Sequence, residues 1–256
     1  MCLILIALNA HPAYKLIIAS NRDEFFDRPA TGIHFWENTP DLLAGKDLRE
    51  GGTWLGITRQ GRIATITNYR DPALLKTDAP SRGRFVLEFL LSHETPEEFI
   101  KKNIEFAHKC NGFNLILGER NRLYWYSNVV GKCRRLAPAI YGLSNHLLDT
   151  PWPKVTRAKT ALQELLSEKS QPLPEDLFTI LSDRSMADDR ELPDTGISTE
   201  WEKRLSSIFI PGPVYGTRSS TLLFLGHDDR VTVMERVFGP DSTPVTDTRF
   251  EFRITS

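Results

Sequence analysis

The chain begins with a short apolar segment placed directly behind a cysteine. The first eight residues read Met-Cys-Leu-Ile-Leu-Ile-Ala-Leu, and the turn-forming run Asn9–Pro12 follows. An apolar run of this length that ends at a turn is typical of a buried β-strand. It lacks the positive flank, the length and the cleavage site of a secretory signal. We therefore expect the chain to start inside a sheet, which holds a terminus that would otherwise fray.

A cysteine at position 2 has a chemical consequence of its own. The initiator Met is normally removed before a residue as small as Cys, and its removal leaves Cys2 with a free α-amine beside its thiol. This is a nucleophile with a built-in base, as in enzymes with an N-terminal threonine. The alternative is a small apolar residue at the start of an edge strand, because Cys often behaves as a buried hydrophobe. The segment alone leaves both interpretations open.

Charge and composition exclude several classes of protein. The formal net charge of the 256 residues is −1, with acids and bases interspersed, whereas a nucleic-acid-binding protein needs a basic excess on one element. No apolar run approaches the roughly 18 residues of a membrane-spanning helix, so we predict no integral membrane segment. Cys2, Cys110 and Cys133 are too widely spaced for a disulfide framework or a metal pair. Sparse cysteines fit a reducing compartment, and without a targeting segment we expect the cytoplasm.

Hairpin patterns recur along the chain, with helical patterns between them. We predict strands at 1–8, 14–20, 51–58, 63–67, 113–117, 123–127, 140–143, 220–225, 231–237 and 249–254. We predict helices at 81–92, from the Thr95 capping box to Asn111, from Thr150 to about Lys169, and at 174–181. Residues 30–49 and 183–199 are predicted to be loops. The pattern indicates an α+β protein, a four-layer αββα sandwich of two antiparallel sheets, and we expect residues 1–256 to form one domain.

Four polar clusters lie where predicted strands end or begin. They are Asn21–Glu24, Asn68–Asp71, Ser144–His146 and Thr217–Ser220. Each alone is typical of a turn, since Asn and Asp are common turn formers. Together with an N-terminal cysteine on a neighbouring strand, they predict a site at the strand ends, where a rigid sheet can position chemistry.

These clusters belong to a set of motifs that resembles the NRDE family, also called the transport-and-Golgi-organisation protein 2 family. The motifs that carry the resemblance are Met1-Cys2, Asn21–Glu24, Gly51–Gly56, Thr67–Pro72, Gly142–Asn145, Pro151–Lys154 and Tyr215–Arg218. The resemblance covers essentially the whole chain. The family is in turn similar to N-terminal-nucleophile (Ntn) hydrolases of the cysteine type, such as choloylglycine hydrolase, penicillin V acylase and acid ceramidase.

The resemblance to Ntn hydrolases implies a role for each matching position. Cys2 matches the nucleophile, Asp23 the residue that holds the α-amine, Asn68 and Asn145 the two residues near the oxyanion, and Arg218 the late catalytic arginine.

One position departs from the pattern. The hydrolases carry an arginine three residues before the aspartate, where this chain has Ser20, and here Arg22 directly precedes Asp23. Adjacent strand residues point to opposite faces, so both can face a site only where the chain bulges or turns.

Two hypotheses about function follow. The resemblance implies a cysteine Ntn amidohydrolase that acts on a linear amide or a thioester. We expect its substrate to contact Asn21, Arg22, Trp54 and Arg70, although Trp54 is also interpreted as a core residue. The alternative is a non-enzymatic binding or transfer protein for haem or for acyl-CoA and lipids, with which members of the family are associated. Arg22, Arg70 and Arg218 would then hold a carboxylate or phosphate.

Partners and cofactors are predicted from the same residues. In both hypotheses the partner is a small molecule and not a nucleic acid. The six histidines show no metal-ligand spacing, and no Cys-x-x-Cys-His sequence is present. We therefore predict no bound metal or cofactor.

Overall fold

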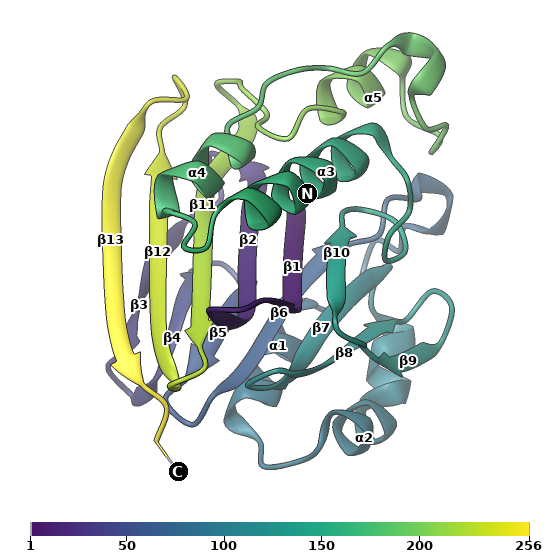
Figure 1. Cartoon of the computed structure of the whole chain (residues 1–256). Helices are drawn as coiled ribbons and strands as arrows, with labels where there is room; N and C mark the ends of the chain where they lie inside the picture. The colour runs from purple at the N-terminus through teal and green to yellow at the C-terminus, as the bar shows by residue number, and fades with distance from the viewer. Residues whose placement is uncertain (1, 256) are drawn as a thin grey trace.

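The protein is built from two antiparallel sheets stacked face to face, with helices on both outer faces (Figure 1). The structure is a computed structural model that describes residues 2–255, with side chains described from residue 3 onward. The predicted four-layer αββα sandwich is confirmed. None of the helices in the described residues is long and apolar enough to cross a membrane.

The first sheet contains the N-terminal strand, which lies beside the edge strand β10. Its six strands follow the order β10-β1-β2-β11-β12-β13, and all neighbours are antiparallel. Their bounds are β1 Cys2–His11, β2 Tyr14–Phe25, β10 Ala139–Leu143, β11 Tyr215–Gly226, β12 Arg230–Phe238 and β13 Pro244–Arg253. Along β1, Ile4 and Ile6 face the second sheet while Leu3 and Leu5 face the helices. Both faces of β1 are covered, which explains its continuous apolar sequence.

The second sheet has seven strands in the order β3-β4-β5-β6-β7-β8-β9. Their bounds are β3 Ala30–Trp36, β4 Thr39–Asp47, β5 Leu55–Thr58, β6 Arg62–Asn68, β7 Phe113–Glu119, β8 Arg122–Ser127 and β9 Lys132–Arg135. The inner faces of the two sheets share one apolar core, to which Ile18 and Leu223 contribute from the first sheet and Ile57 and Ile116 from the second.

Two pairs of helices cover the outer faces, and a fifth helix lies apart from them. Their bounds are α1 Gly83–Leu91, α2 Pro96–Lys109, α3 Pro153–Glu168, α4 Pro174–Leu181 and α5 Thr199–Leu205. Phe85, Phe89 and Phe99 of α1 and α2 pack on the second sheet. Helices α3 and α4 cover the first sheet, and α5 lies beyond its upper strand ends in Figure 1.

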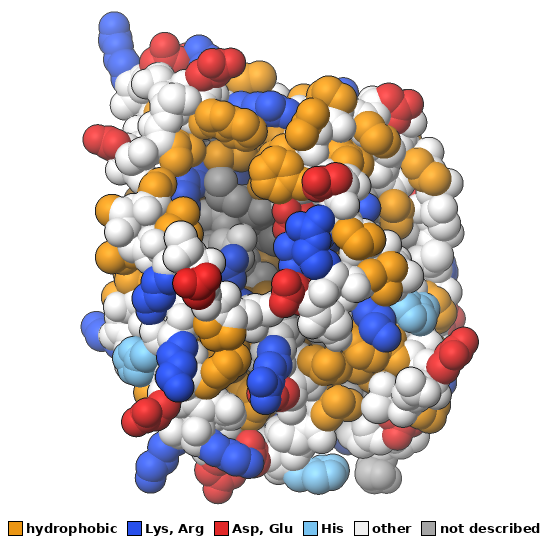
Figure 2. Space-filling model, turned by 180° about the vertical axis from the view of Figure 1, so that it is seen from behind, with side chains coloured by type: hydrophobic (Ala, Val, Ile, Leu, Met, Phe, Trp, Pro, Cys, Tyr) orange, Lys and Arg blue, Asp and Glu red, His pale blue; other side chains and the backbone are white. Residues whose placement is uncertain are grey.

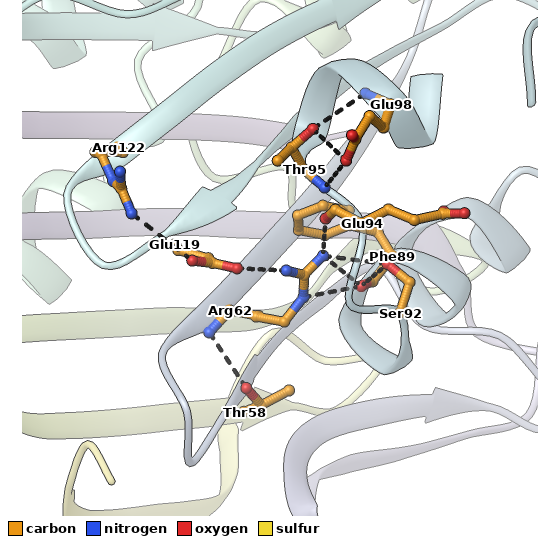
Figure 3. A network of polar contacts seen from close by, with 9 residues as sticks. All are labelled: Thr58, Arg62, Phe89, Ser92, Glu94, Thr95, Glu98, Glu119 and Arg122. Atoms are coloured by element: carbon orange, nitrogen blue, oxygen red, sulfur yellow. Dashed lines mark hydrogen bonds and ion pairs between the residues drawn. The ribbon is translucent and has the colours of Figure 1, made fainter. Parts of the chain in front are cut away.

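A buried arginine at the start of β6 fastens the corner between α1 and α2 (Figure 3). The Arg62 guanidinium donates to the carbonyl oxygens of Phe89 and Glu94 and pairs with Glu119. The adjoining α2 begins with the predicted capping box, in which Thr95 and Glu98 bond each other's backbone N–H.

The prediction of a loop at residues 30–49 was wrong, because the segment forms β3 and β4. The β3–β4 ladder shifts register twice, and such bulges interrupt the period-two pattern by which a strand is predicted. Two further elements were not predicted. Strand β9 (Lys-Cys-Arg-Arg) is a charged edge strand, and α5 has only seven residues.

The start of the third predicted helix also needs correction. The helix begins at Pro153 with Trp152 at the N-cap, instead of beginning behind Thr150. The Thr150 hydroxyl donates to the carbonyl of Leu147 and contacts His146 Nδ1, so it closes the preceding turn.

Candidate functional site

Five strand ends meet at one edge of the sandwich, and they bring the predicted polar clusters together. They are the start of β1, the ends of β2, β6 and β10, and the start of β11. A polar cavity of about 260 Å³ opens among them, and Arg22, Asp23, Trp54 and Asn68 contribute to its lining. Figure 2 shows a hollow on this side of the molecule with basic and acidic side chains around its rim. Of the four predicted clusters, Asn21–Glu24 and Asn68–Asp71 contribute residues to the cavity lining, whereas Ser144–His146 and Thr217–Ser220 do not.

The predicted nucleophile is placed only by its backbone. Cys2 pairs with Arg22 across the β1–β2 ladder, and Leu3 pairs with Asn21. The Cys2 side chain and Met1 lie outside the described residues, so the nucleophile and its free amine stay predictions.

Asp23 is a wholly buried carboxylate at the end of β2. Its Oδ1 accepts a hydrogen bond of 2.7 Å from Thr217 of β11, the strand residue opposite it. Burial raises the pKa of Asp23, while the positive charge of Lys154, the Thr217 hydrogen bond and the charge of Arg22 oppose that rise. Lys154 is itself buried, in the first turn of α3. The helix dipole disfavours a cation there, and the charge of Lys154 favours the ionised form of Asp23 without reversing the effect of burial.

Arg22 lies on the other side of the same strand. Its guanidinium stacks on the Trp54 ring, with Cζ 4.2 Å from the ring centroid. Gly45 makes this position possible, since a Cβ at residue 45 would lie 2.3 Å from Trp54 Cζ2. Trp54 also packs against two apolar clusters, so both of its predicted roles, core residue and cavity wall, are compatible with its position.

The departure of Arg22 from the Ntn pattern has a structural answer. The cavity lies around the end of β2, so Arg22 and Asp23 both line it although they are adjacent. Beside them β11 carries a bulge: Thr217 pairs with Asp23 and Ser219 with Arg22, which leaves Arg218 as the extra residue. Bulges of this kind re-aim side chains near functional sites.

The two predicted oxyanion residues differ in their surroundings. Asn68 lines the cavity at the end of β6, and no described group hydrogen-bonds its side-chain amide. Asn145 is wholly buried and does not line the cavity; its Nδ2 donates to the carbonyl of Asn68 at 3.0 Å. Asn145 therefore holds the strand end from which Asn68 projects.

Three other predicted residues are engaged outside the cavity lining. The Asn21 amide donates to the carbonyls of Leu181 and Ile208 on the helix side of the sheet. Arg70 pairs with Glu202 of α5 in a buried ion pair. Arg218 donates to the carbonyls of Phe25 and Arg28, and its pKa is lowered by burial and by the charge of Arg22.

The opposite wall of the cavity was not predicted from the sequence. Residues 79–83, at the start of α1, form it together with Asn111 and the Arg28–Asp47 ion pair. The wall approaches Thr53 closely because Gly52 and Gly83 lack side chains, and a Cβ at residue 52 would lie 2.6 Å from the Gly83 carbonyl carbon. Within the motif Gly51–Gly56, Gly52 was the sequence signal for this close approach.

The described lining residues do not fit haem. None of them is a His, Met, Cys or Tyr, the residues that ligate haem iron, and the lining is mainly polar. Among the described side chains, no group of three His, Cys, Asp or Glu gathers at metal-binding distance.

The layers and the cavity define the class: an αββα protein of two antiparallel sheets, with a charged cavity at the strand ends beside its N-terminal strand. A family model described as Transport and Golgi organisation 2 matches residues 1–240. The chain belongs to this family, so the resemblance found in the sequence is confirmed.

Relatives from distant organisms are similar over their full length. The chain is 37% identical to the Transport and Golgi organization protein 2 homolog of Bos taurus, over 100% of both chains. It is 35% identical to the Homo sapiens homolog, again over 100% of both chains. An uncharacterized Saccharomyces cerevisiae protein is 28% identical, over 99% of this chain and 100% of the yeast protein.

Solved structures with a similar arrangement are much more distant in sequence. A C2A mutant of the conjugated bile acid hydrolase from Clostridium perfringens superposes with a TM-score of 0.45 at 9% identity, over 100% of this chain and 98% of that one. A Caenorhabditis elegans ortholog of N-acylethanolamine-hydrolyzing acid amidase gives a TM-score of 0.42 at 11% identity, over 87% and 92%. At these values we draw no functional argument from either structure.

Proposed function

We propose that the chain is an N-terminal cysteine amidohydrolase that cleaves a linear amide or a thioester. Cys2 would be the nucleophile, and its α-amine the base once Met1 is removed. The observation that carries the proposal is the placement of Asp23. Its carboxylate is wholly buried at the strand end, one residue beyond the backbone partner of Cys2, and it lines an open cavity.

A purely structural role explains Asp23 poorly. Burying a carboxylate costs folding free energy, and the raised pKa of Asp23 means that its hydrogen bond and nearby charges do not fully offset that cost. Titratable groups of this kind, in a cavity and with defined charged neighbours, concentrate at functional sites. Holding an ammonium group at the start of β1 is a role that needs this carboxylate at this place.

The proposed reaction assigns one task to each group. The Cys2 thiolate adds to the amide carbonyl carbon, so that a C–S bond forms and the π electrons move to oxygen. The Asn68 amide donates to that oxygen; losing such a donor typically costs about 3–4 kcal/mol of barrier. The protonated α-amine, stabilised by Asp23, gives its proton to the leaving nitrogen as the C–N bond breaks. Water, deprotonated by the amine, then hydrolyses the thioester that remains.

The alternative, a carrier of haem or of an acyl chain, has less support. The cavity lining is mainly polar and includes seven charged side chains, whereas a site for an apolar ligand is lined predominantly by hydrophobic and aromatic groups. No observation in the described residues favours the carrier over the enzyme.

Intact mass spectrometry before and after brief treatment with iodoacetamide at pH 8 tests the proposal. We expect a mass without Met1 and one fast adduct, at Cys2. Cys110 and Cys133 serve as internal controls, because burial raises the pKa of both thiols, that of Cys133 to about 11. At pH 8 only about a thousandth of Cys133 would be thiolate, against about a quarter of an unperturbed thiol. Retention of Met1, or a Cys2 no faster than the controls, would overturn the proposal.

A further inference from the structure

Arg22 is the one cavity-lining arginine whose guanidinium has no described acceptor. The residue is buried, with a relative exposure of 8%, and it lines the cavity. No described side chain or carbonyl accepts a hydrogen bond from it. Its guanidinium lies over the Trp54 ring, and its charge acts on the carboxylates of Asp23 and Glu235 without an ion pair to either in the described residues. A buried cation without a partner is costly, so this position calls for an anion in the cavity.

The other arginines nearby are already engaged. Arg28 donates to Asp47 through Nε at 3.0 Å, Arg82 donates to the Gly112 carbonyl at 3.1 Å, and Arg218 donates to the Phe25 carbonyl at 3.2 Å. Arg22 therefore differs from its neighbours in having its donors available.

Glu235 is an alternative partner to consider, because it lines a small pocket of about 30 Å³ together with Arg22. Its Oε2 accepts the Ile33 N–H at 2.6 Å, and its Oε1 faces the Thr221 hydroxyl at 3.4 Å. No ion pair joins Glu235 to Arg22 among the described residues, so the Arg22 donors stay open to the cavity.

Shape and charge indicate which anion fits. The Arg22 Cζ lies over the Trp54 ring, no described group accepts from its N–H groups, and a guanidinium edge matches a planar carboxylate with two parallel hydrogen bonds. The lining also holds four acidic side chains, Asp23, Glu24, Asp47 and Glu50, against three arginines. These acids disfavour a multiply charged phosphate more strongly than a monoanion.

We propose that the cavity binds a substrate carboxylate, held edge-on by Arg22 while the face of the guanidinium rests on Trp54. The substrate class is then an amide that carries one carboxylate near the scissile bond. The carboxylate lies either on the amine side, as in an N-acyl amino acid, or on the acyl side, as in the monoamide of a dicarboxylic acid. The inference rests on the proposed function for turnover, but the binding it describes does not need catalysis.

Calorimetric titration of the Cys2→Ala protein tests the binding without turnover. The probes are N-acetylglycine against its neutral counterpart N-acetylglycinamide, and succinamate against succinamide. We expect at least one carboxylate to bind about tenfold or more tightly than its neutral partner, and the pair that does so identifies the side that carries the charge. Equal affinity within both pairs, or no binding of either carboxylate at millimolar concentration, overturns the inference.

Arg22 variants locate the effect. Arg22→Gln should abolish the preference for the carboxylate, and Arg22→Lys should keep part of it because the charge remains without the planar fork. Arg59→Gln is the matched control: Arg59 also stacks on an aromatic ring, Phe35 at 4.2 Å, but lies outside the cavity lining. A preference that survives Arg22→Gln would overturn the assignment to Arg22.

The two proposals fail separately. If the carboxylate preference is found but wild-type protein hydrolyses neither N-acetylglycine nor succinamate and its Cys2 is unreactive, the amidohydrolase is wrong and the binding site stands. If Cys2 is activated but no carboxylate preference exists, the carboxylate site is wrong and the amidohydrolase proposal stands.

Discussion

Arg22 and Asp23, at the end of β2, are adjacent in sequence but have different neighbours and different proposed roles. Asp23 lies with Thr217 and the α3 side of the sheet, whereas Arg22 reaches Trp54, directly before β5 of the second sheet. Strand alternation places them on opposite faces, and the cavity at the strand end is open to both. The NRDE sequence thus supplies one group for the proposed amine site and one for the proposed carboxylate site.

Replacing Asp23 tests whether its buried charge is kept for function. The folded-state pKa of Asp23 is raised by burial, so the folded protein binds more protons than the unfolded chain between the two pKa values. Wild-type stability should therefore fall as pH rises through that window. We expect Asp23→Asn to raise the free energy of unfolding at pH 7 by about 0.5–2 kcal/mol and to abolish the fast alkylation of Cys2. Urea denaturation between pH 4 and 8 would measure the difference, which should shrink towards the unfolded pKa of about 3.9.

Asp183 is the matched control with the opposite sign. Although burial raises its pKa, hydrogen bonds from Ser185 and Arg157 lower the pKa overall. Asp183→Asn should therefore lose stability at pH 7, and the loss should disappear as the pH falls through the unfolded pKa. If Asp23→Asn also lowers the free energy of unfolding at pH 7, then burying the Asp23 carboxylate does not destabilise the folded protein. The functional argument, which depends on that destabilisation, would then fail.

Among the elements, β11 and the α1–α2 corner show how local irregularity serves the site. The bulge at Arg218 shifts the register of β11 by one residue, so that Thr217 rather than Arg218 lies opposite Asp23. The corner between α1 and α2 holds the helix that follows the outer cavity wall of residues 79–83, and Arg62 fastens that corner from β6.

Removing Arg62 should lower the stability of this corner and leave the reactivity of Cys2 unchanged. Arg62→Met removes the guanidinium from the Glu94 carbonyl, from the Ser92 hydroxyl and from the Phe89 carbonyl, which keeps its Ser92 donors, and an unsatisfied buried group costs about 1–3 kcal/mol. We expect a loss of about 2–4 kcal/mol in the free energy of unfolding, measured by urea denaturation, with Cys2 alkylation preserved. Arg122→Ala, at an exposed partner of the same Glu119, should change stability by less than about 0.5 kcal/mol. Equal effects of the two variants would show that the Arg62 network contributes nothing special.

For the whole molecule, one buried ion pair connects segments far apart in the sequence. Arg70, just beyond β6, pairs with Glu202 of α5, and its side chain also lies 4.8 Å from the Trp152 ring. Both partners are almost fully buried, so α5 is attached to the strand ends through this pair.

Breaking the pair should be costly from either side. We expect Arg70→Met to lower the free energy of unfolding by about 3–5 kcal/mol, because the buried Glu202 keeps its hydrogen bonds from Thr195 but loses its cation. The double variant Arg70→Met, Glu202→Leu should recover much of the loss, since apolar groups can replace a buried ion pair. Hydrogen exchange in residues 195–205 would follow the attachment of α5. A double variant less stable than the single one would contradict this account.

Much of the architecture could be predicted because the responsible signals are local. Continuous apolar runs, hairpin turns and the Thr95 capping box identified most strands and helices, and their alternation indicated two antiparallel sheets with helices outside. The polar clusters at the strand ends and their resemblance to the family identified Asp23, Asn68 and Arg22 as site residues, and these three line the cavity. That the whole chain forms one domain stays a prediction.

The sequence by itself determined the layers, the family and the residues that gather at one edge of the sheets, because period, turn chemistry and motif order are properties of neighbouring residues. Only the tertiary structure decided which polar groups stay available there. The side chains of Asn21, Arg70 and Arg218 are bound by carbonyls or by a carboxylate from distant segments of the chain, and Arg218 also lies in a local bulge of β11. The N–H groups of Arg22 instead stay open to the cavity. The strands β3 and β4 and the outer cavity wall likewise depend on partners distant in the chain. Whether a buried polar group finds a hydrogen-bond partner depends on residues distant in the sequence, and no local sequence pattern specifies those residues.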